Sequence, residues 1–255
     1  MTLRLSTGTR NGLAQGLGFV GLFNRGSINI YSGAQPATAD SAVTGTLLGT
    51  VTAGSGALTQ ETQATGTVTI AGAAGSIDTI TVGGLNIIPD GGVPFNTSLT
   101  QTAADVAEAI NRNGVYTATA AVAVITLKPR PGAGAAHNAA VVTSTSTTLT
   151  ATYANMGGGI AAVNGLILGS PVTGVVAKRA SQVWSFNGLA AGTAGWFRFI
   201  ASVADAGAAI TVAPFLARLD GSVAVSGGDM SLSNIAVTLN APNTIDAFTW
   251  TQPAQ

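Results

Sequence analysis

A glycine-rich run near the start of the chain has the spacing of a nucleotide-binding loop. Residues 16–21 read Gly-Leu-Gly-Phe-Val-Gly, a match to G-x-G-x-x-G, and Asp40 follows about 20 residues later. That chemistry needs a buried strand before the glycines and a surrounding βαβ unit, and the sequence provides neither. We therefore expect the match to reflect the 34 glycines of the chain and predict no cofactor.

The side chains that could transfer protons are few and scattered. His137, the single histidine, lies in the turn-like stretch 134–138, and catalysis would need both an orienting partner and a nucleophile within hydrogen-bond reach. Asp105 and Glu108 share one face of a predicted helix and could serve metal or acid–base chemistry. An exposed helix face accounts for both equally well, so we predict that the protein is not an enzyme.

Several other aspartates lie in or beside turns. Asp90-Gly91 and Asp220-Gly221 are typical turn sequences, and Asp78 and Asp229 have similar surroundings. A structural calcium held by such turns stays open, although no EF-hand loop is present. We predict no metal-binding residues.

The three tryptophans allow two interpretations. Trp184, Trp196 and Trp250 could form a platform on which sugars stack. Each lies in a stretch of alternating polar and apolar residues, which favours packing in a core. An interface anchor and a glycan contact remain the alternatives.

The low charge is the most informative property of the composition. Hydrophobic residues make up 46% of the 255 residues, whereas charged residues make up 8%, against roughly 25% in an ordinary soluble protein. Soluble monomers usually need interspersed charges to stay apart. A surface of Thr, Ser, Asn, Gln, Gly and Ala instead suits permanent burial against partners.

The charge pattern also narrows the classes of partner. Ten Lys and Arg balance ten Asp and Glu, and the densest basic spots, 128–130 and 178–179, are too short to grip nucleic acid. No cysteine is present, which excludes disulfides and thiolate zinc sites. The apolar runs are shorter than the about 20 residues of a membrane span, and no signal peptide opens the chain. We expect neither nucleic acid nor membrane as a partner.

The first 60 residues predict one short helix and two strands. Leu13, Leu17, Val20 and Phe23 would line one face of a helix, although the glycines between them each cost up to about 1 kcal/mol. Alternating or β-branched residues then predict strands at 27–31 and 46–52, before a Gly- and Ser-rich linker at 53–64.

The middle of the chain predicts a small α+β unit. Ser98 and Gln101 form a capping-box pattern, apolar residues follow at helical spacing from Ala103 to Ile110, and Gly114 is a typical helix end. Strands are expected around this one helix, in the ranges 67–70, 77–82, 85–88, 116–127 and 139–152. A second glycine-rich linker follows at 155–159.

The last third predicts a series of short strands that contains most of the aromatic residues. Glycine or proline separates the expected strands 161–168, 182–186, 196–204, 222–225, 235–239 and 244–251, which is typical of a sandwich or barrel. We expect the following aromatic residues to form the main core or to anchor an interface: Trp184, Phe186, Trp196, Phe197, Phe199, Phe215, Phe248 and Trp250.

These elements predict a mainly β chain with an insertion. Residues 1–60 hold too few core residues to fold alone, so we expect them to join residues 160–255 in one antiparallel β-sandwich, jelly-roll or immunoglobulin-like. Residues 61–159 would form the small α+β domain, inserted at a loop tip, where insertions are best tolerated.

The two outer segments resemble a family of tailed-bacteriophage and prophage virion proteins. The residues that carry this resemblance are 3–8, 30–40, 44–48, 192–199, 219–222 and 229–234. Residues 78–84, 102–111 and 116–119 are similar to small domains of phage tail and surface proteins. The resemblance implies a structural component of the virion, assembled in the bacterial host cytoplasm, and brings no catalytic residue.

The first expectation for function is capsid decoration, in which the sandwich binds the major capsid protein or other virion proteins. Many weak, uncharged contacts would be summed over a symmetric lattice, and the isolated protein is expected to form a homo-oligomer. Two alternatives remain: a tail component (tube, surface or fibre-associated) and a glycan-binding module for host recognition.

Overall fold

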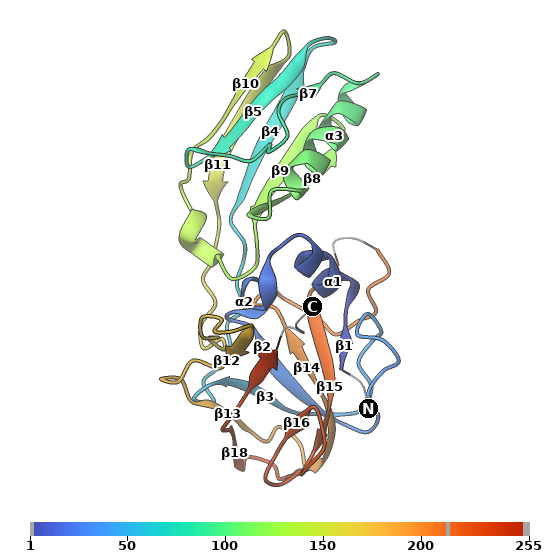
Figure 1. The fold of residues 1–255 in the computed structure, drawn as a ribbon, viewed down its shortest axis with the longest axis vertical. Helices are drawn as coiled ribbons and strands as arrows, with labels where there is room; N and C mark the ends of the chain where they lie inside the picture. Colours follow the sequence, from blue (N-terminus) through green and yellow to red (C-terminus); the bar gives the residue numbers. More distant parts are fainter. Residues whose placement is uncertain (1–2, 213–214, 252–255) are drawn as a thin grey trace. The chain divides into compact units, whose positions relative to one another are not determined.

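The chain divides into two compact units (Figure 1). The structure, a computed structural model, describes residues 3–212 and 215–251. Unit 1 comprises Met1–Glu61 and Ala162–Gln255, and unit 2 comprises Thr62–Ala161. Both boundaries lie within two residues of those expected from the glycine-rich linkers. The fold is mainly β, with antiparallel, sandwich-like sheets and few helices.

Unit 1 is built around one large sheet with the strand order β1-β15-β14-β2-β3-β13-β18. β17 extends it beside β14, and β16 adds a short parallel pairing to β15. β12 and β19 form a separate antiparallel pair. The elements are β1 (Arg4–Leu5), α1 (Thr7–Ala14), α2 (Gly18–Phe23), β2 (Ser27–Ser32), β3 (Leu47–Ala53), β12 (Val175–Ala177), β13 (Trp184–Asn187), β14 (Gly192–Ile200), β15 (Arg218–Ala224), β16 (Met230–Ser231), β17 (Ala236–Val237), β18 (Pro242–Ile245) and β19 (Thr249–Thr251).

The order of the strands explains why the two outer segments fold together. β2 lies between β14 and β3, so its partners come from both ends of unit 1. In Figure 1 the blue strands β2 and β3 accordingly lie among the orange and red strands of the C-terminal segment. Neither segment could complete this sheet without the other.

Alternation along β14 gives the sheet two chemically different faces. Phe197 and Phe199 point to one face, where Phe199 contacts Phe19 and Phe23 of α2. Trp196 and Arg198, one residue out of step, point to the other face. All four β14 side chains are at most 2% exposed, so both faces of the sheet are covered at β14.

The single helix predicted within residues 3–23 is wrong, because the chain forms α1 and α2 there. Gly16 and Gly18 have φ values of 79° and 63°, a left-handed conformation that ends one helix and turns the chain before the next. Ser6 caps α1 by accepting a hydrogen bond from the Thr9 amide at 3.2 Å. Leu13, Leu17 and Val20 still pack against the core, although they come from α1, from the connection between the helices and from α2.

Two predicted strands of the C-terminal segment also differ from the structure. Residues 161–168 form no strand, because their successive bridges reach three separate partners, Thr59, Gly26 and Lys178. The expected strand 244–251 is divided into β18, which pairs with β13, and β19, which pairs with β12. A ladder cannot continue where the partner changes every few residues.

Unit 2 combines two sheets with one α-helix. The sheets have the orders β10-β5-β6, with β7 also on β5, and β11-β4-β9-β8. Side chains from both sheets and from α3 form its core. The elements are β4 (Thr65–Ala71), β5 (Ser76–Val82), β6 (Leu85–Asn86), β7 (Val93–Pro94), α3 (Leu99–Asn111), β8 (Tyr116–Ala121), β9 (Val124–Pro129), a 3-10 turn η1 (Gly134–His137), β10 (Val142–Thr147) and β11 (Thr150–Gly157).

Helix α3 has the predicted cap and also protects an edge of the sheet. Ser98 accepts a hydrogen bond from the Gln101 backbone amide at 3.2 Å, which is one half of the predicted capping box. The Gln101 side chain, however, donates to Asp105 and not back to Ser98. At the other end, the Asn111 side chain bonds both the N–H and the C=O of Ala118 on β8, at 2.9 and 3.0 Å. Because unpaired edges invite pairing with other chains, Asn111 takes the place of a neighbouring strand.

Candidate functional site

Most of the aromatic candidates form the core of unit 1. Trp184 and Phe199 are fully buried and Phe197 is 2% exposed. Phe248 and Trp250 are partly buried against the same core, and the Trp250 ring stacks on Phe19 with centroids 4.7 Å apart. Five candidates therefore hold the aromatic face of the sheet together.

Trp196 packs on the opposite, polar face. Its ring is fully buried and stacks on Tyr31, with centroids 4.5 Å apart. The Arg198 guanidinium lies 5.5 Å from the ring centroid on the same face. With Trp184 and Trp196 both inaccessible, the three tryptophans do not form a platform for sugars.

The prediction that Phe215 belongs to the core is wrong. Its side chain is 38% exposed and lies in the loop before β15. Phe215 is not part of a paired β-strand, so the alternation that places an aromatic residue on the buried face of a strand does not apply to it. Its role as an interface anchor stays a prediction.

Two buried ion pairs occupy the polar face beside Trp196. Arg198 binds both carboxylate oxygens of Asp220 at 2.7 Å, and Arg218 binds both oxygens of Asp205 at 2.6 Å. All four side chains are at most 3% exposed. Paired forks of this kind are the strong form of the arginine–carboxylate contact.

The same arginines hold the loops that cover this face. Arg198 donates to the carbonyl oxygen of Ser41 at 3.1 Å, and Arg218 donates to those of Ala39 and Ala208 at 3.4 and 2.9 Å. These carbonyls belong to the loops between β2 and β3 and between β14 and β15. The two arginines thus tie both loops to the polar face of the sheet.

Burial raises the pKa of two groups in this layer. Desolvation raises the pKa of Asp220 above its ordinary value, while the hydrogen bonds and the charge of Arg198 act in the opposite direction. Desolvation likewise raises the pKa of Tyr31, against the charge of Arg198. The environment is therefore one in which the pairing of charges, and not water, stabilises the ions.

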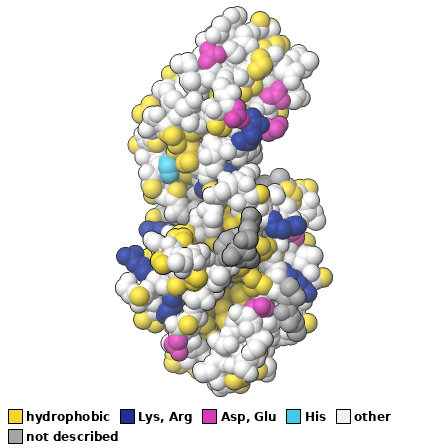
Figure 2. Space-filling view, in the orientation of Figure 1, with side chains coloured by type: hydrophobic (Ala, Val, Ile, Leu, Met, Phe, Trp, Pro, Cys, Tyr) yellow, Lys and Arg dark blue, Asp and Glu magenta, His cyan; other side chains and the backbone are white. Residues whose placement is uncertain are grey.

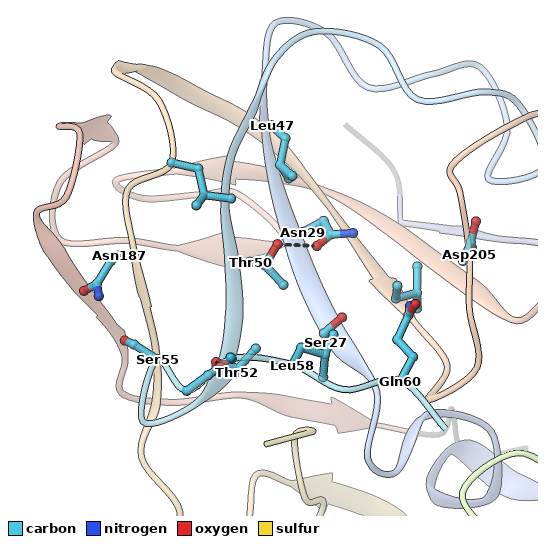
Figure 3. A pocket seen from close by; sticks show the side chains of 14 residues that line it. Ser27, Asn29, Leu47, Thr50, Thr52, Ser55, Leu58, Gln60, Asn187 and Asp205 are labelled. Carbon is cyan, nitrogen blue, oxygen red and sulfur yellow. Dashed lines mark hydrogen bonds between the residues drawn. The ribbon is translucent and has the colours of Figure 1, made fainter. Parts of the chain in front are cut away.

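An open groove lies on the uncovered part of the polar face, with a volume of about 530 Å³. Its floor is formed by Ser27 and Asn29 of β2 and by Thr50 and Thr52 of β3. Figure 3 shows Thr50 and Asn29 side by side on adjacent strands, where the Thr50 hydroxyl donates to the Asn29 carbonyl oxygen at 2.9 Å. The walls come from the segment after β3, from the end of β13 and its following loop, and from the region after β14: Ser55, Gly56, Ala57, Leu58, Gln60, Asn187, Leu189, Ile200 and Asp205, with Leu47 at the start of β3.

Sequence reasoning did not single out this groove. A signal was available in β2, where Ser27 and Asn29 alternate with the buried Ile28 and Ile30. Such alternation indicates a polar face, but it does not say which loops leave that face open. The residues that could bind a ligand here are hydroxyl and amide groups, without a lysine or arginine among the lining residues.

The remaining sequence candidates have structural contacts. Asp40 accepts hydrogen bonds from the Thr7 amide and hydroxyl at 3.0 and 2.7 Å. The run 16–21 spans the end of the turn after α1 and the first residues of α2. A helix, and not a buried strand, directly precedes it, so it is not a dinucleotide-binding loop. His137 lies in η1, where its Nδ1 is 2.6 Å from the Tyr116 hydroxyl.

The carboxylates also lie apart from one another. Asp105 accepts hydrogen bonds from Asn96 and Gln101, both at 2.8 Å, and Glu108 lies 3.4 Å from Arg112. Within residues 3–212 and 215–251, no group of three or more His, Asp or Glu side chains could hold a metal ion. No helix in these ranges is both long and apolar enough to cross a membrane.

Comparisons with known proteins add no relative to this description. The chain matches no protein-family model, no curated protein and no solved structure.

Proposed function

We propose that the protein is a non-enzymatic structural component of a bacteriophage particle, and specifically a decoration protein bound to the major capsid lattice. The proposal joins the resemblance of the outer segments to phage virion proteins with one property of the structure. That property is a surface with very little charge, because four of the few charged side chains are buried in ion pairs.

The ion pairs remove charge from a chain that has little to begin with. Ten basic and ten acidic residues are available, and Arg198, Arg218, Asp205 and Asp220 are all enclosed. In Figure 2 the charged side chains on the visible face are few, and apart from one group of basic and acidic side chains in the upper part of the view they are separated by wide uncharged and hydrophobic areas. A surface of this kind gives weak electrostatic protection against association.

Large apolar side chains add to this surface in both units. They are at least 38% exposed and comprise Leu85, Val115, Val122, Val141, Tyr153, Ile160, Val163, Val172, Val183, Leu189, Val212, Phe215, Val225 and Leu239. Single exposed apolar residues are ordinary, but they are usually surrounded by charge. Here they suit contacts with other virion proteins and with further copies of this chain, in which many weak contacts add up.

Cryo-electron microscopy of purified phage particles from the host that produces this chain tests the proposal. We expect copies on the icosahedral shell, in a number set by the capsid lattice. Copies confined to the tail would overturn the decoration role in favour of a tail component. Absence of the chain from purified particles would overturn the virion assignment altogether.

A further inference from the structure

The groove on the polar face of unit 1 has the features of a small-ligand site. Its volume of about 530 Å³ falls within the range of about 300–1,000 Å³ that is typical of such sites. Ser27 on the floor is 1% exposed, and its hydroxyl has no hydrogen-bond partner among the described residues. Buried polar groups are normally satisfied, so this hydroxyl is an unused donor and acceptor at the base of the groove.

The charges around the groove select a neutral ligand. Asp205 is the one charged residue in the lining, and both of its carboxylate oxygens are bound by Arg218 at 2.6 Å. An anion would find no cation there, and a cation would compete with a buried arginine. The remaining polar groups are hydroxyls and amides, which bind uncharged partners by hydrogen bonding.

Apolar side chains complete the lining and favour a ligand with both polar and C–H surfaces. Leu189 is 57% exposed at one wall, and Leu47 and Leu58 contribute further apolar surface. A pyranose ring presents hydroxyls at its edge and C–H groups on its faces. The groove offers a matching combination of amide and hydroxyl groups beside leucines.

The strand pairing disfavours a peptide. Peptides that bind sheets usually add a strand to a free edge, where the main chain supplies the affinity. Here β2 is paired on both sides, by β14 and β3, and β3 is paired by β2 and β13. Recognition must therefore come from side chains on the face of the sheet, as in binding to sugar hydroxyls.

We propose that this groove binds a short neutral oligosaccharide, with Ser27, Asn29, Thr50, Gln60 and Asn187 as the polar contacts. The inference goes beyond the structural role and does not depend on it. It also differs from a tryptophan-based glycan site, because the groove contains no aromatic side chain. A protein that is absent from the capsid could still bind sugar, and a capsid protein could fail to bind it.

Saturation-transfer NMR on the full chain tests the proposal with maltotriose, cellotriose and chitotriose, each titrated to about 10 mM so that a complex with a Kd near 1 mM is saturated. We expect at least one of these neutral trisaccharides to bind and the anionic sialyllactose not to bind. Binding of none of the three would overturn the proposal. Binding only of a neutral peptide, for which acetyl-Ser-Thr-Ala-Thr-amide is the probe, would also overturn it.

Variants locate the site. Asn187→Ala and Thr50→Val each remove polar groups from the groove and are expected to weaken binding about fivefold, the effect of one hydrogen bond. The Asn187 side chain is exposed at the end of β13, so its truncation should leave folding intact. Thr152→Val, at an exposed position on β11 of unit 2, is the matched control and should bind as the wild type does. Equal binding by all three variants would place the sugar elsewhere and refute the assignment to the groove.

Discussion

The pair formed by Arg198 and Asp220 gives a sharp test of the idea that buried charge holds unit 1 together. Asp220→Asn changes almost no volume, so its effect comes from the lost charge and the lost acceptor oxygen and not from packing. The guanidinium of Arg198, 1% exposed, would keep its positive charge while it loses a carboxylate bound at two points, each 2.7 Å away. Removing one partner of a buried pair costs about 3–5 kcal/mol, a large part of the roughly 5–15 kcal/mol that stabilises a typical domain.

Urea unfolding followed by tryptophan fluorescence is the appropriate assay, because all three tryptophans lie in unit 1. Asp246→Asn is the matched control: the same chemical change in the same unit, at an exposed position, with an expected effect within about 0.5 kcal/mol. A free energy of unfolding for Asp220→Asn within about 1 kcal/mol of the wild type would refute the reasoning.

Four further predictions follow from other positions. Gly49→Ala would place a Cβ 2.1 Å from the Phe186 ring and should lower the free energy of unfolding by about 1–3 kcal/mol. Gly21→Ala in α2, with its nearest contact at 3.7 Å, should instead raise the free energy of unfolding by as much as about 1 kcal/mol. Fluorescence-monitored unfolding measures both. Burial raises the pKa of Tyr31; above pH of about 10 the unfolded chain loses this proton first, so stability should fall as pH rises from 9 to 11, and less steeply in Tyr31→Phe. Asn111→Ala removes two hydrogen bonds from the edge of β8, which should cost about 1–3 kcal/mol by circular dichroism and increase light scattering on storage; unchanged scattering would count against its role at the edge. Val122 has a φ of 55° in the turn between β8 and β9, so Val122→Gly should raise stability by about 1 kcal/mol, and a loss would mean that the valine makes a contact worth more than its strain.

The architecture could be predicted because its signals are local. Glycine-rich stretches mark both linkers, and the capping residues of α3 stand three positions apart in the sequence, so each can be recognised without knowledge of the fold. The division into α1 and α2 could not be predicted in this way, since it depends on the left-handed conformation of Gly16 and Gly18.

The polar face was not predictable in the same way. Arg198 stands between two phenylalanines, which reads as an ordinary alternating strand with one exposed side. Its pairing with Asp220 is set by the register of β14 against β15, in which the two residues face each other. The exposure of Phe215 and the opening of the groove likewise depend on the paths of loops, which no local pattern specifies.

The discontinuity of unit 1 has a consequence for the order in which the chain folds as it is synthesised. β2 pairs with β14, more than 150 residues later in the sequence, whereas the strands of unit 2 all lie within Thr62–Ala161. Because domains generally fold as the chain emerges, unit 2 can be complete on the ribosome while residues 1–61 still lack their partners. During that interval the apolar strand β2, with Ile28 and Ile30, is open to pairing with other nascent chains, and slow synthesis between residues 162 and 200 would lengthen the exposure.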